Sequence, residues 1–179
     1  MFAVVDIETT GGNYKTGRII ELAVAIFDGN SVVDTFETLI NPCCEIPTFI
    51  TGLTGIDKLM VRNAPRFHQI AKKFIQMTVG HIFVAHNVSF DYSYIKQEYK
   101  ELGYNFQMPR ICTLLESRKV FPHLKSHGLG NLCKDLNIVN HDRHRAMGDV
   151  LATVELLKLI MKAKESNFQG GFNIKNDEK

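Results

Sequence analysis

The chain has 179 residues, of which 45% are hydrophobic and 22% are charged, and these values are typical of a single globular domain. The formal net charge of +2 is too balanced to indicate nucleic-acid binding by itself, and no apolar run approaches the roughly 18 residues that a membrane span requires. Because the start of the chain shows no signal-peptide pattern, we expect a soluble, cytoplasmic protein without a membrane partner.

The first 60 residues are predicted to form strands and then short helices. Apolar runs rich in β-branched residues occupy residues 2–6 and 19–27, and an Asp-Gly-Asn turn signal separates the second run from a third at residues 31–40. This arrangement predicts a hairpin. Two prolines then end the strand pattern, and short helical pieces are expected within residues 48–60.

The rest of the chain alternates between helical and strand patterns. The expected elements are a helix opened by Pro65 and closed by Gly80, a strand at 81–85, a helix through Leu102 with Asn87 as its N-cap, a short strand at 109–112, and helices at 113–120, 127–136 and 145–164. Three strands followed by alternating helices and strands predict an α/β fold with one mixed sheet flanked by helices.

The domain is expected to span residues 1–165. Residues 166–179 are polar, contain glycine and show no periodicity, so they are predicted to be a tail or a linker.

The four cysteines show no CxxC spacing, and Cys43 and Cys44 are adjacent, which suits neither an ordinary disulfide nor a zinc site. We therefore expect free thiols in a reducing compartment.

Two carboxylates end the first predicted strand. Asp6 and Glu8 share one face of that strand, since side chains alternate, while Ile7 points to the other face. Charges on a central strand are costly unless a cation holds them. The hydroxyls and glycines at residues 9–12 either let the backbone approach a phosphate or a 3′ hydroxyl closely, or simply form a tight turn out of the sheet.

A second acidic position follows the strand at 81–85. Asp91 falls in the first turn or so of the predicted helix after Asn87. The helix macrodipole favours an acid at that place, so a structural role is an alternative to a functional one. Phe90 beside it either belongs to the core or stacks on a base.

The third position pairs His144 with Asp149. Five residues correspond to about 140° around a regular helix, so the two side chains would not share a helix face. They converge only if His144 lies on the loop before the helix and Asp149 lies inside it. The polar residues 140–143 are consistent with such a loop.

Together these segments resemble the three motifs of the DEDD exonuclease superfamily in its DEDDh branch, which includes the proofreading (epsilon) subunit of bacterial DNA polymerase III. The motifs are DIETTGG at Asp6, HNVSFD ending at Asp91, and His-x4-Asp at residues 144–149. The likeness covers residues 1 to about 163 and includes the segments at 51–56 and 126–133. It implies a ribonuclease H-like fold with a five-stranded mixed sheet whose second strand is antiparallel to the first.

The resemblance also implies a 3′→5′ exonuclease that releases nucleoside monophosphates from nucleic-acid 3′ ends, with DNA favoured. By that resemblance, two Mg²⁺ ions, which Mn²⁺ can replace, are held by four acids, and His144 acts as the general base. The acids are Asp6, Glu8, Asp91 and Asp149. The groove for the last nucleotides would be formed by Ile7, Thr9, Thr10, Gly11, Thr54, Ile56, Asn87 and Phe90. Thr54 departs from the histidine of the polymerase III subunit.

The residue types suit this chemistry. Mg²⁺ prefers oxygen ligands, and two ions about 3.5–4 Å apart can activate water and stabilise a leaving oxygen. Uncompensated carboxylates about 4 Å apart repel by on the order of 4 kcal/mol per pair at an effective dielectric of 20, so metal-free protein is expected to be less stable or locally disordered at this site. An imidazole can accept the water's proton at neutral pH.

Two other functions remain open from the sequence. One is an RNA-trimming exonuclease that resembles ribonuclease T or oligoribonuclease, whose motifs would look the same. The other is a non-catalytic module that binds nucleic acid or a partner, although none of the four acids is missing. The expected partners are DNA or RNA 3′ ends and, through the C-terminal segment, a DNA polymerase subunit or a fused domain.

Overall fold

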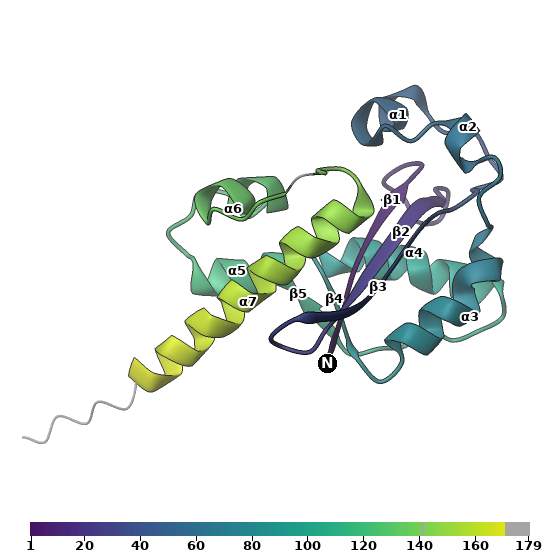
Figure 1. Cartoon of the computed structure of the whole chain (residues 1–179). Coiled ribbons are helices and arrows are strands. Elements are labelled where there is room, and N and C mark those ends of the chain that lie inside the picture. Colours follow the sequence, from purple (N-terminus) through teal and green to yellow (C-terminus); the bar gives the residue numbers. More distant parts are fainter. Residues whose placement is uncertain (141, 171–179) are drawn as a thin grey trace, which may run out of the picture.

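The computed structural model describes residues 1–140 and 142–170 and contains one five-stranded sheet flanked by helices (Figure 1). The strand order is β3-β2-β1-β4-β5, with β1 antiparallel to β2 and parallel to β4. The strands are β1 (Phe2–Thr9), β2 (Ile19–Phe27), β3 (Val32–Leu39), β4 (Ile82–Ala85) and β5 (Arg110–Cys112). The predicted mixed sheet with a central first strand and an antiparallel second strand is therefore confirmed.

Seven helices occur among the residues that the structure describes. They are α1 (Thr48–Thr54), α2 (Lys58–Val61), α3 (Phe67–Thr78), α4 (Val88–Glu101), α5 (Thr113–Val120), α6 (Leu129–Asp135) and α7 (Ala146–Gly170). Helices α1 and α2 project beyond the end of β1 (Figure 1), where Ile20, Ile50, Ile56 and Val61 form their own small cluster. No helix in the described part of the chain is long and apolar enough to cross a membrane.

The central strand β1 separates two hydrophobic cores. Val4 packs in the core beneath α7, together with Val150 and Val154. Val5 and Ile7 point to the opposite core, beneath α3 and α4. Since side chains alternate along a strand, Asp6 and Glu8 continue the row of Val4 and face the N-terminal end of α7. The expectation that the two acids share a face is confirmed.

Helix α4 is fixed by aromatic contacts on its buried side. Tyr99 stacks on Phe106 with ring centroids 5.0 Å apart, and its hydroxyl donates a hydrogen bond to the Ala71 carbonyl at 2.6 Å. One turn or two earlier, the Tyr92 hydroxyl accepts a hydrogen bond from the Met108 N–H at 2.9 Å. These bonds hold α4 against α3 and against the segment that leads into β5.

Most predicted elements are present, and α5 has the predicted bounds of residues 113–120. Asn87 stands at the N-cap of α4, but its side chain makes no capping hydrogen bond, so that part of the prediction is wrong. The reason is its left-handed backbone, with φ 67°, whereas capping side chains require an extended backbone.

Helix α7 is longer than predicted and continues to Gly170 instead of ending near residue 164. The first residues of the segment expected to be a tail are therefore helical, and residues 171–179 lie outside the described residues. The four cysteines are free thiols, as expected.

Candidate active site

Four acids from three elements line one small pocket. Asp6 and Glu8 come from the end of β1, Asp91 from the first turn of α4, and Asp149 from the first turn of α7. The pocket has a volume of about 250 Å³, and His144 also lines it. We call this the acidic pocket. The fold thus brings together all five residues that the sequence singled out, although the three motifs lie far apart in the chain.

The acids are crowded and partly or fully removed from water. Asp91 is 3% exposed, while Asp6 and Glu8 are half-buried. Burial, and then the charges of Asp91 and Asp149, raise the pKa of Asp6 well above its usual value. Burial and the charge of Asp149 raise the pKa of Glu8 to about 8. Burial also raises the pKa of Asp91 to about 8, although backbone N–H groups oppose that shift.

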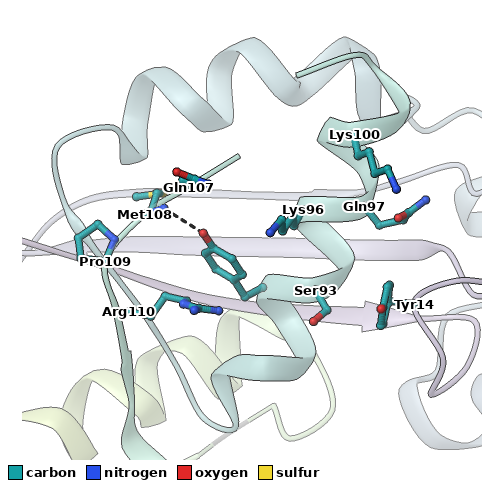
Figure 2. Close-up of a pocket in the computed structure, with 10 residues that line it drawn as sticks. Tyr14, Ser93, Lys96, Gln97, Lys100, Gln107, Met108, Pro109 and Arg110 are labelled. Carbon is teal, nitrogen blue, oxygen red and sulfur yellow. Dashed lines mark hydrogen bonds between the residues drawn. The ribbon is translucent and has the colours of Figure 1, made fainter. Parts of the chain in front are cut away.

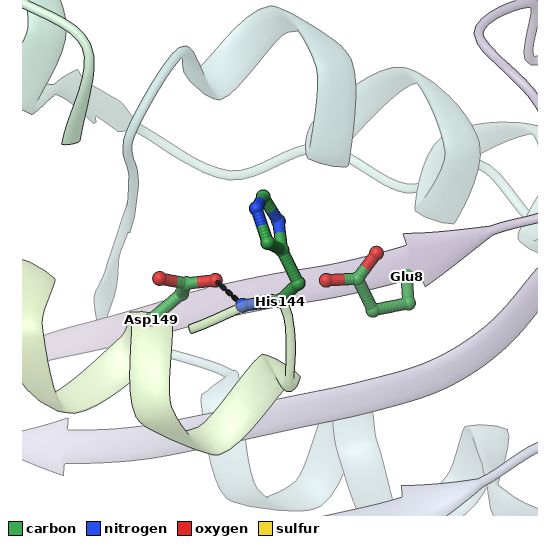
Figure 3. Close-up of side chains that lie close together, drawn as sticks. All are labelled: Glu8, His144 and Asp149. Carbon is green, nitrogen blue, oxygen red and sulfur yellow. Dashed lines mark hydrogen bonds between the residues drawn. The ribbon is translucent and has the colours of Figure 1, made fainter. Parts of the chain in front are cut away.

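His144 lies on the loop before α7, as its convergence with Asp149 required. Its backbone is left-handed, with φ 65°, and its N–H donates a hydrogen bond to Asp149 Oδ2 at 3.0 Å. Asn140 Nδ2 donates to Oδ1 of the same carboxylate at 2.7 Å. Glu8, His144 and Asp149 each offer one ligand atom, and these atoms lie within 4.8 Å of one another (Figure 3).

A glycine allows this loop to approach the helix. A Cβ on Gly148 would lie 2.3 Å from the Asp142 carbonyl oxygen, so any side chain there would push the loop away from α7. Asp149 directly follows Gly148, and its carboxylate holds His144. The glycine in the third motif is therefore required for the positions of both residues.

A buried carboxylate anchors the same loop from the sheet. Glu21 on β2 pairs with Glu8 across the strands and is 4% exposed. Its carboxylate accepts hydrogen bonds from Arg145, including one from Nη2 at 2.6 Å, and one from the Ala146 N–H at 2.9 Å. The Glu21–Arg145 pair therefore fixes the two residues that directly follow His144. The sequence pattern does not single out Glu21, because an acid within an apolar strand gives no sign of its partner.

A second histidine, His86, lines the pocket, but both of its ring nitrogens have hydrogen-bond partners. His86 Nε2 lies 2.9 Å from the His127 carbonyl oxygen, and Nδ1 lies 3.0 Å from the Thr113 hydroxyl. A carbonyl only accepts, so Nε2 carries the proton and Nδ1 accepts from Thr113. Burial lowers the pKa of His86 and favours this neutral form. Within the described residues, neither ring nitrogen of His144 has such a partner, so His144 alone offers a free imidazole to the pocket.

The residues expected to contact the nucleotide fall into two groups. Ile7, Asn87 and Phe90 line the acidic pocket. Phe90 is only partly buried and packs against Tyr94 with ring centroids 5.1 Å apart. The other expected residues lie outside the lining, namely Thr9, Thr10, Gly11, Thr54 and Ile56.

The threonines of the second group make hydrogen bonds within their own turns. The Thr9 hydroxyl donates to the Gly11 carbonyl at 2.7 Å, and the Thr10 hydroxyl accepts from the Arg18 N–H at 2.9 Å. Thr54 is 5% exposed and bonds within its own turn, and Ile56 is fully buried. The structure does not bring the side chains of Thr54 and Ile56 to the acids.

One cationic side chain of the pocket was not predicted. Arg143 lines the pocket, and its guanidinium lies so close to Gly130 that a Cβ there would be 2.8 Å from it. Only the polar character of residues 140–143 hinted at this loop, and that pattern is too common to single out an arginine.

The acidic pocket fits a divalent cation. All four acids offer oxygen ligands, and among the described residues the group close enough to share an ion is Glu8, His144 and Asp149. The raised pKa values of Asp6, Glu8 and Asp91 show that the protein alone does not balance their charge. A bound cation would remove that cost. The pocket thus offers the oxygen-rich lining that such an ion prefers.

The chain belongs to the family described as Exonuclease, which matches residues 3–157. Its relatives include a PolC-type DNA polymerase III of Caldanaerobacter subterraneus subsp. tengcongensis, 39% identical over 165 residues. Another is the 3′-5′ exonuclease DinG of Staphylococcus saprophyticus, 37% identical over 166 residues. Both alignments cover 92% of this chain but only 12% and 18% of the relatives, so this domain corresponds to a small part of each.

Solved structures share the fold. Exonuclease X in complex with 5′ overhanging duplex DNA has a TM-score of 0.75 and 26% identity, and the match covers 92% of this chain and 93% of that one. The nuclease domain of 3′hExo, a DEDDh family member bound to rAMP, has a TM-score of 0.77 and 18% identity, with 90% and 91% covered. Escherichia coli exonuclease I, solved with single-stranded DNA in a zinc-bound form, has a TM-score of 0.82 at 20% identity, with 94% and 42% covered. The predicted exonuclease family is confirmed by the family match, and these solved structures share its fold.

Proposed function

We propose that this domain is a 3′→5′ exonuclease that hydrolyses the terminal phosphodiester of DNA with two Mg²⁺ ions. The observation that carries the proposal is the convergence of four acids and one free imidazole in a single pocket. A structural role for Asp91 at the helix N-terminus does not account for that convergence, because Asp91 lies among three other acids. Membership of the exonuclease family and the likeness to Exonuclease X support the same reaction.

The four carboxylates would hold the ions, which when bound supply charge stabilisation at the phosphate and lower the cost of ionising water. His144 then has a defined task. Its ring projects from the loop between the carboxylates of Glu8 and Asp149 (Figure 3). From that position the imidazole can take a proton from the attacking water.

The remaining chain holds His144 ready for this proton transfer. The Asp149 carboxylate binds the His144 N–H, and Glu21 binds Arg145 and the Ala146 N–H. The loop is therefore held from both sides, from α7 and from β2. Such preorganisation reduces the rearrangement needed when substrate arrives.

Phe90 and Asn87 border the entrance on α4, and Arg143 borders it on the loop before α7. An aromatic ring can stack on a terminal base, and a guanidinium can bind a phosphate oxygen. We propose these roles for Phe90 and Arg143. Thr9, Thr10 and Gly11 would contribute through the backbone of their turn, and Thr54 and Ile56 by supporting the packing of α1 beyond the end of β1.

The test is a gel assay of end-labelled single- and double-stranded DNA and RNA with Mg²⁺, Mn²⁺ or EDTA. We expect stepwise shortening from the 3′ end, faster on DNA than on RNA, that EDTA abolishes. Faster trimming of RNA would overturn the choice of substrate but not the reaction. Absence of hydrolysis with either metal would overturn the function.

The domain is further proposed to work within or beside a larger DNA-processing protein. The support is its 39% identity to a segment that makes up 12% of a PolC-type polymerase. Co-purification with a DNA polymerase from the source cells would test that association.

A further inference from the structure

A second cavity lies on the exposed side of α4. With a volume of about 760 Å³ it is three times as large as the acidic pocket, at about 250 Å³. It is bounded by α4 on one side and by the segment leading into β5 on the other (Figure 2). We call it the basic groove and define it by Tyr14, Ser93, Lys96, Gln97, Lys100 and Arg110.

The groove carries positive charge without acidic partners. Lys96, Lys100 and Arg110 line it, and no aspartate or glutamate does. In the part of the chain that the structure describes, none of these three cations forms an ion pair. By contrast, Arg18 near the same helix is paired with Glu98 and Glu101. The cations of the groove are therefore available to an anionic ligand.

The floor of the groove is rigid. The Arg110 guanidinium lies over the Tyr92 ring, 4.3 Å from its centroid. The Tyr92 hydroxyl in turn accepts the Met108 N–H at 2.9 Å, the bond drawn in Figure 2. The tyrosine thus ties α4 to the opposite wall and keeps Arg110 in place at the groove surface. A preformed site loses less entropy when a ligand binds.

The groove and the acidic pocket border the same helix, α4, at successive positions along its length. Phe90 lines the acidic pocket, and Ser93, Gln97 and Lys100 line the groove. Positions three, seven and ten residues after Phe90 fall on the same face of a helix. The turn after β1 is held against the same helix, because the Tyr94 hydroxyl donates a hydrogen bond to the Gly11 carbonyl.

We infer that the basic groove binds the sugar–phosphate backbone of the substrate strand upstream of the 3′ end held in the acidic pocket. This inference rests on the proposed function. With a rise of about 1.5 Å per residue, Lys96 and Lys100 lie roughly 9 and 15 Å along α4 from Phe90. At the spacing of about 3.4 Å per nucleotide that a strand has in duplex DNA, that distance corresponds to the third to fifth nucleotide from the end.

The other groove residues suit the same ligand. Tyr14 is 38% exposed at the groove edge, where its ring can stack on a base without sequence preference. Ser93 and Gln97 offer neutral donors for phosphate oxygens. The acids of the pocket would bind metal ions that neutralise the phosphate at the 3′ end. The phosphates further upstream lie beyond those ions, so the cations of the groove would neutralise them instead.

The first experiment measures binding without hydrolysis. The anisotropy of fluorescein-labelled oligo-dT and oligo-rU of twelve nucleotides is followed in EDTA over a range of salt concentrations. The Lys96→Gln/Lys100→Gln variant should raise the Kd about tenfold and reduce the salt slope by about 1.4, or roughly 0.7 per lost phosphate contact. Lys72→Gln, an exposed lysine on α3, is the matched control and should change the slope little. Equal effects of the double variant and of Lys72→Gln overturn the inference.

The second experiment separates the groove from catalysis. The p-nitrophenyl ester of thymidine 5′-monophosphate offers one nucleotide and cannot reach the groove. The double variant should raise the KM for the twelve-nucleotide strand in Mg²⁺ and leave hydrolysis of the ester unchanged. Equal losses on both substrates would show that the substitutions act through the acidic pocket, and the inference would be wrong. If the wild-type protein cleaves neither substrate, the proposed function fails. The binding experiment still tests whether the groove binds the strand, because it does not depend on hydrolysis.

Discussion

The acidic pocket and the basic groove lie along the same helix and differ in the solvent exposure of their charged side chains. Asp91 on α4 is 3% exposed and sits among three other acids, whereas Lys96 and Lys100 on the same helix are exposed. In the pocket, burial raises the pKa of the acids, since each carboxylate loses hydration and meets its neighbours' charge. In the groove, water and salt screen the lysines. Substitutions in the pocket should therefore lower the rate of hydrolysis strongly, whereas substitutions in the groove should weaken binding moderately.

The largest effect is expected from the acids that would hold metal. Asp6→Asn or Asp149→Asn should lower kcat by several orders of magnitude, because a two-ion reaction loses a ligand of fixed position. The fold should persist, and in EDTA the melting temperature of Asp6→Asn should rise, since one crowded charge is removed. Circular dichroism and the gel assay measure both effects. Glu155→Gln on the exposed face of α7 is the matched control, and substantial remaining activity in either pocket variant would contradict the site.

His144→Ala should have the next largest effect. Loss of a general base typically lowers a rate by about 10²- to 10⁴-fold. The four carboxylates remain, so the affinity for Mg²⁺ measured by calorimetry should stay nearly unchanged. Because a ring nitrogen of His144 lies within 4.8 Å of oxygens of Glu8 and Asp149, a strong loss of affinity would instead make it a ligand.

Glu21→Gln tests the support beneath the pocket. Without the carboxylate charge, Arg145 loses its ion pair, and the loop that carries His144 is held less firmly. We expect a fall in kcat of roughly 10- to 100-fold, the range seen when residues behind a metal site are changed, with little change in KM. Arg145→Gln should act similarly, and the double variant should cost no more than either single change. Additive effects would show that the two residues do not work as a pair.

The smallest effect is a dependence of metal-free stability on pH. The pKa of Glu8 rises from 4.5 to about 8 on folding, and that of Asp91 from 3.8 to about 8. Groups with raised pKa values stabilise the fold when protonated, so this stability is present at acidic pH and is lost as pH rises toward 8. The melting temperature in EDTA should fall by on the order of 5 °C over that interval.

Mg²⁺ should reverse this trend, because it binds the deprotonated ligands. The difference in melting temperature between Mg²⁺ and EDTA should therefore widen as pH rises. The Asp6→Asn variant should show a weaker dependence. A melting temperature in EDTA that increases between acidic pH and pH 8 would contradict the crowding of the acids.

The sequence was sufficient for the sheet and for the faces of β1. Period-two alternation placed Asp6 and Glu8 together, and the hairpin signal at residues 28–30 placed β3 beside β2. Helix ends were less predictable. The side chain of Asn87 does not cap α4, because tertiary packing set its backbone in the left-handed region. The helix propensities of the residues along the chain contain no information about such tertiary packing.

The chain pattern also indicated that His144 had to lie on a loop to meet Asp149, but it contained no sign of how the loop is held. Glu21 and Arg145 are 124 positions apart and pair only because β2 lies next to β1 beneath the start of α7. The basic groove was likewise invisible in a net charge of +2, since acids elsewhere on the surface cancel its lysines in any sum.

The resemblance of three motifs to a known family implied the reaction class, while the sequence by itself determined the strand that carries two acids and the condition that His144 lie on a loop to meet Asp149. Those features are local patterns whose spacing along the chain has a direct physical meaning. Only the tertiary structure decided the Glu21–Arg145 support, the engagement of His86 and the course of the basic groove along α4. These depend on which elements pack together, and burial and charge pairing between distant segments are properties of the folded chain.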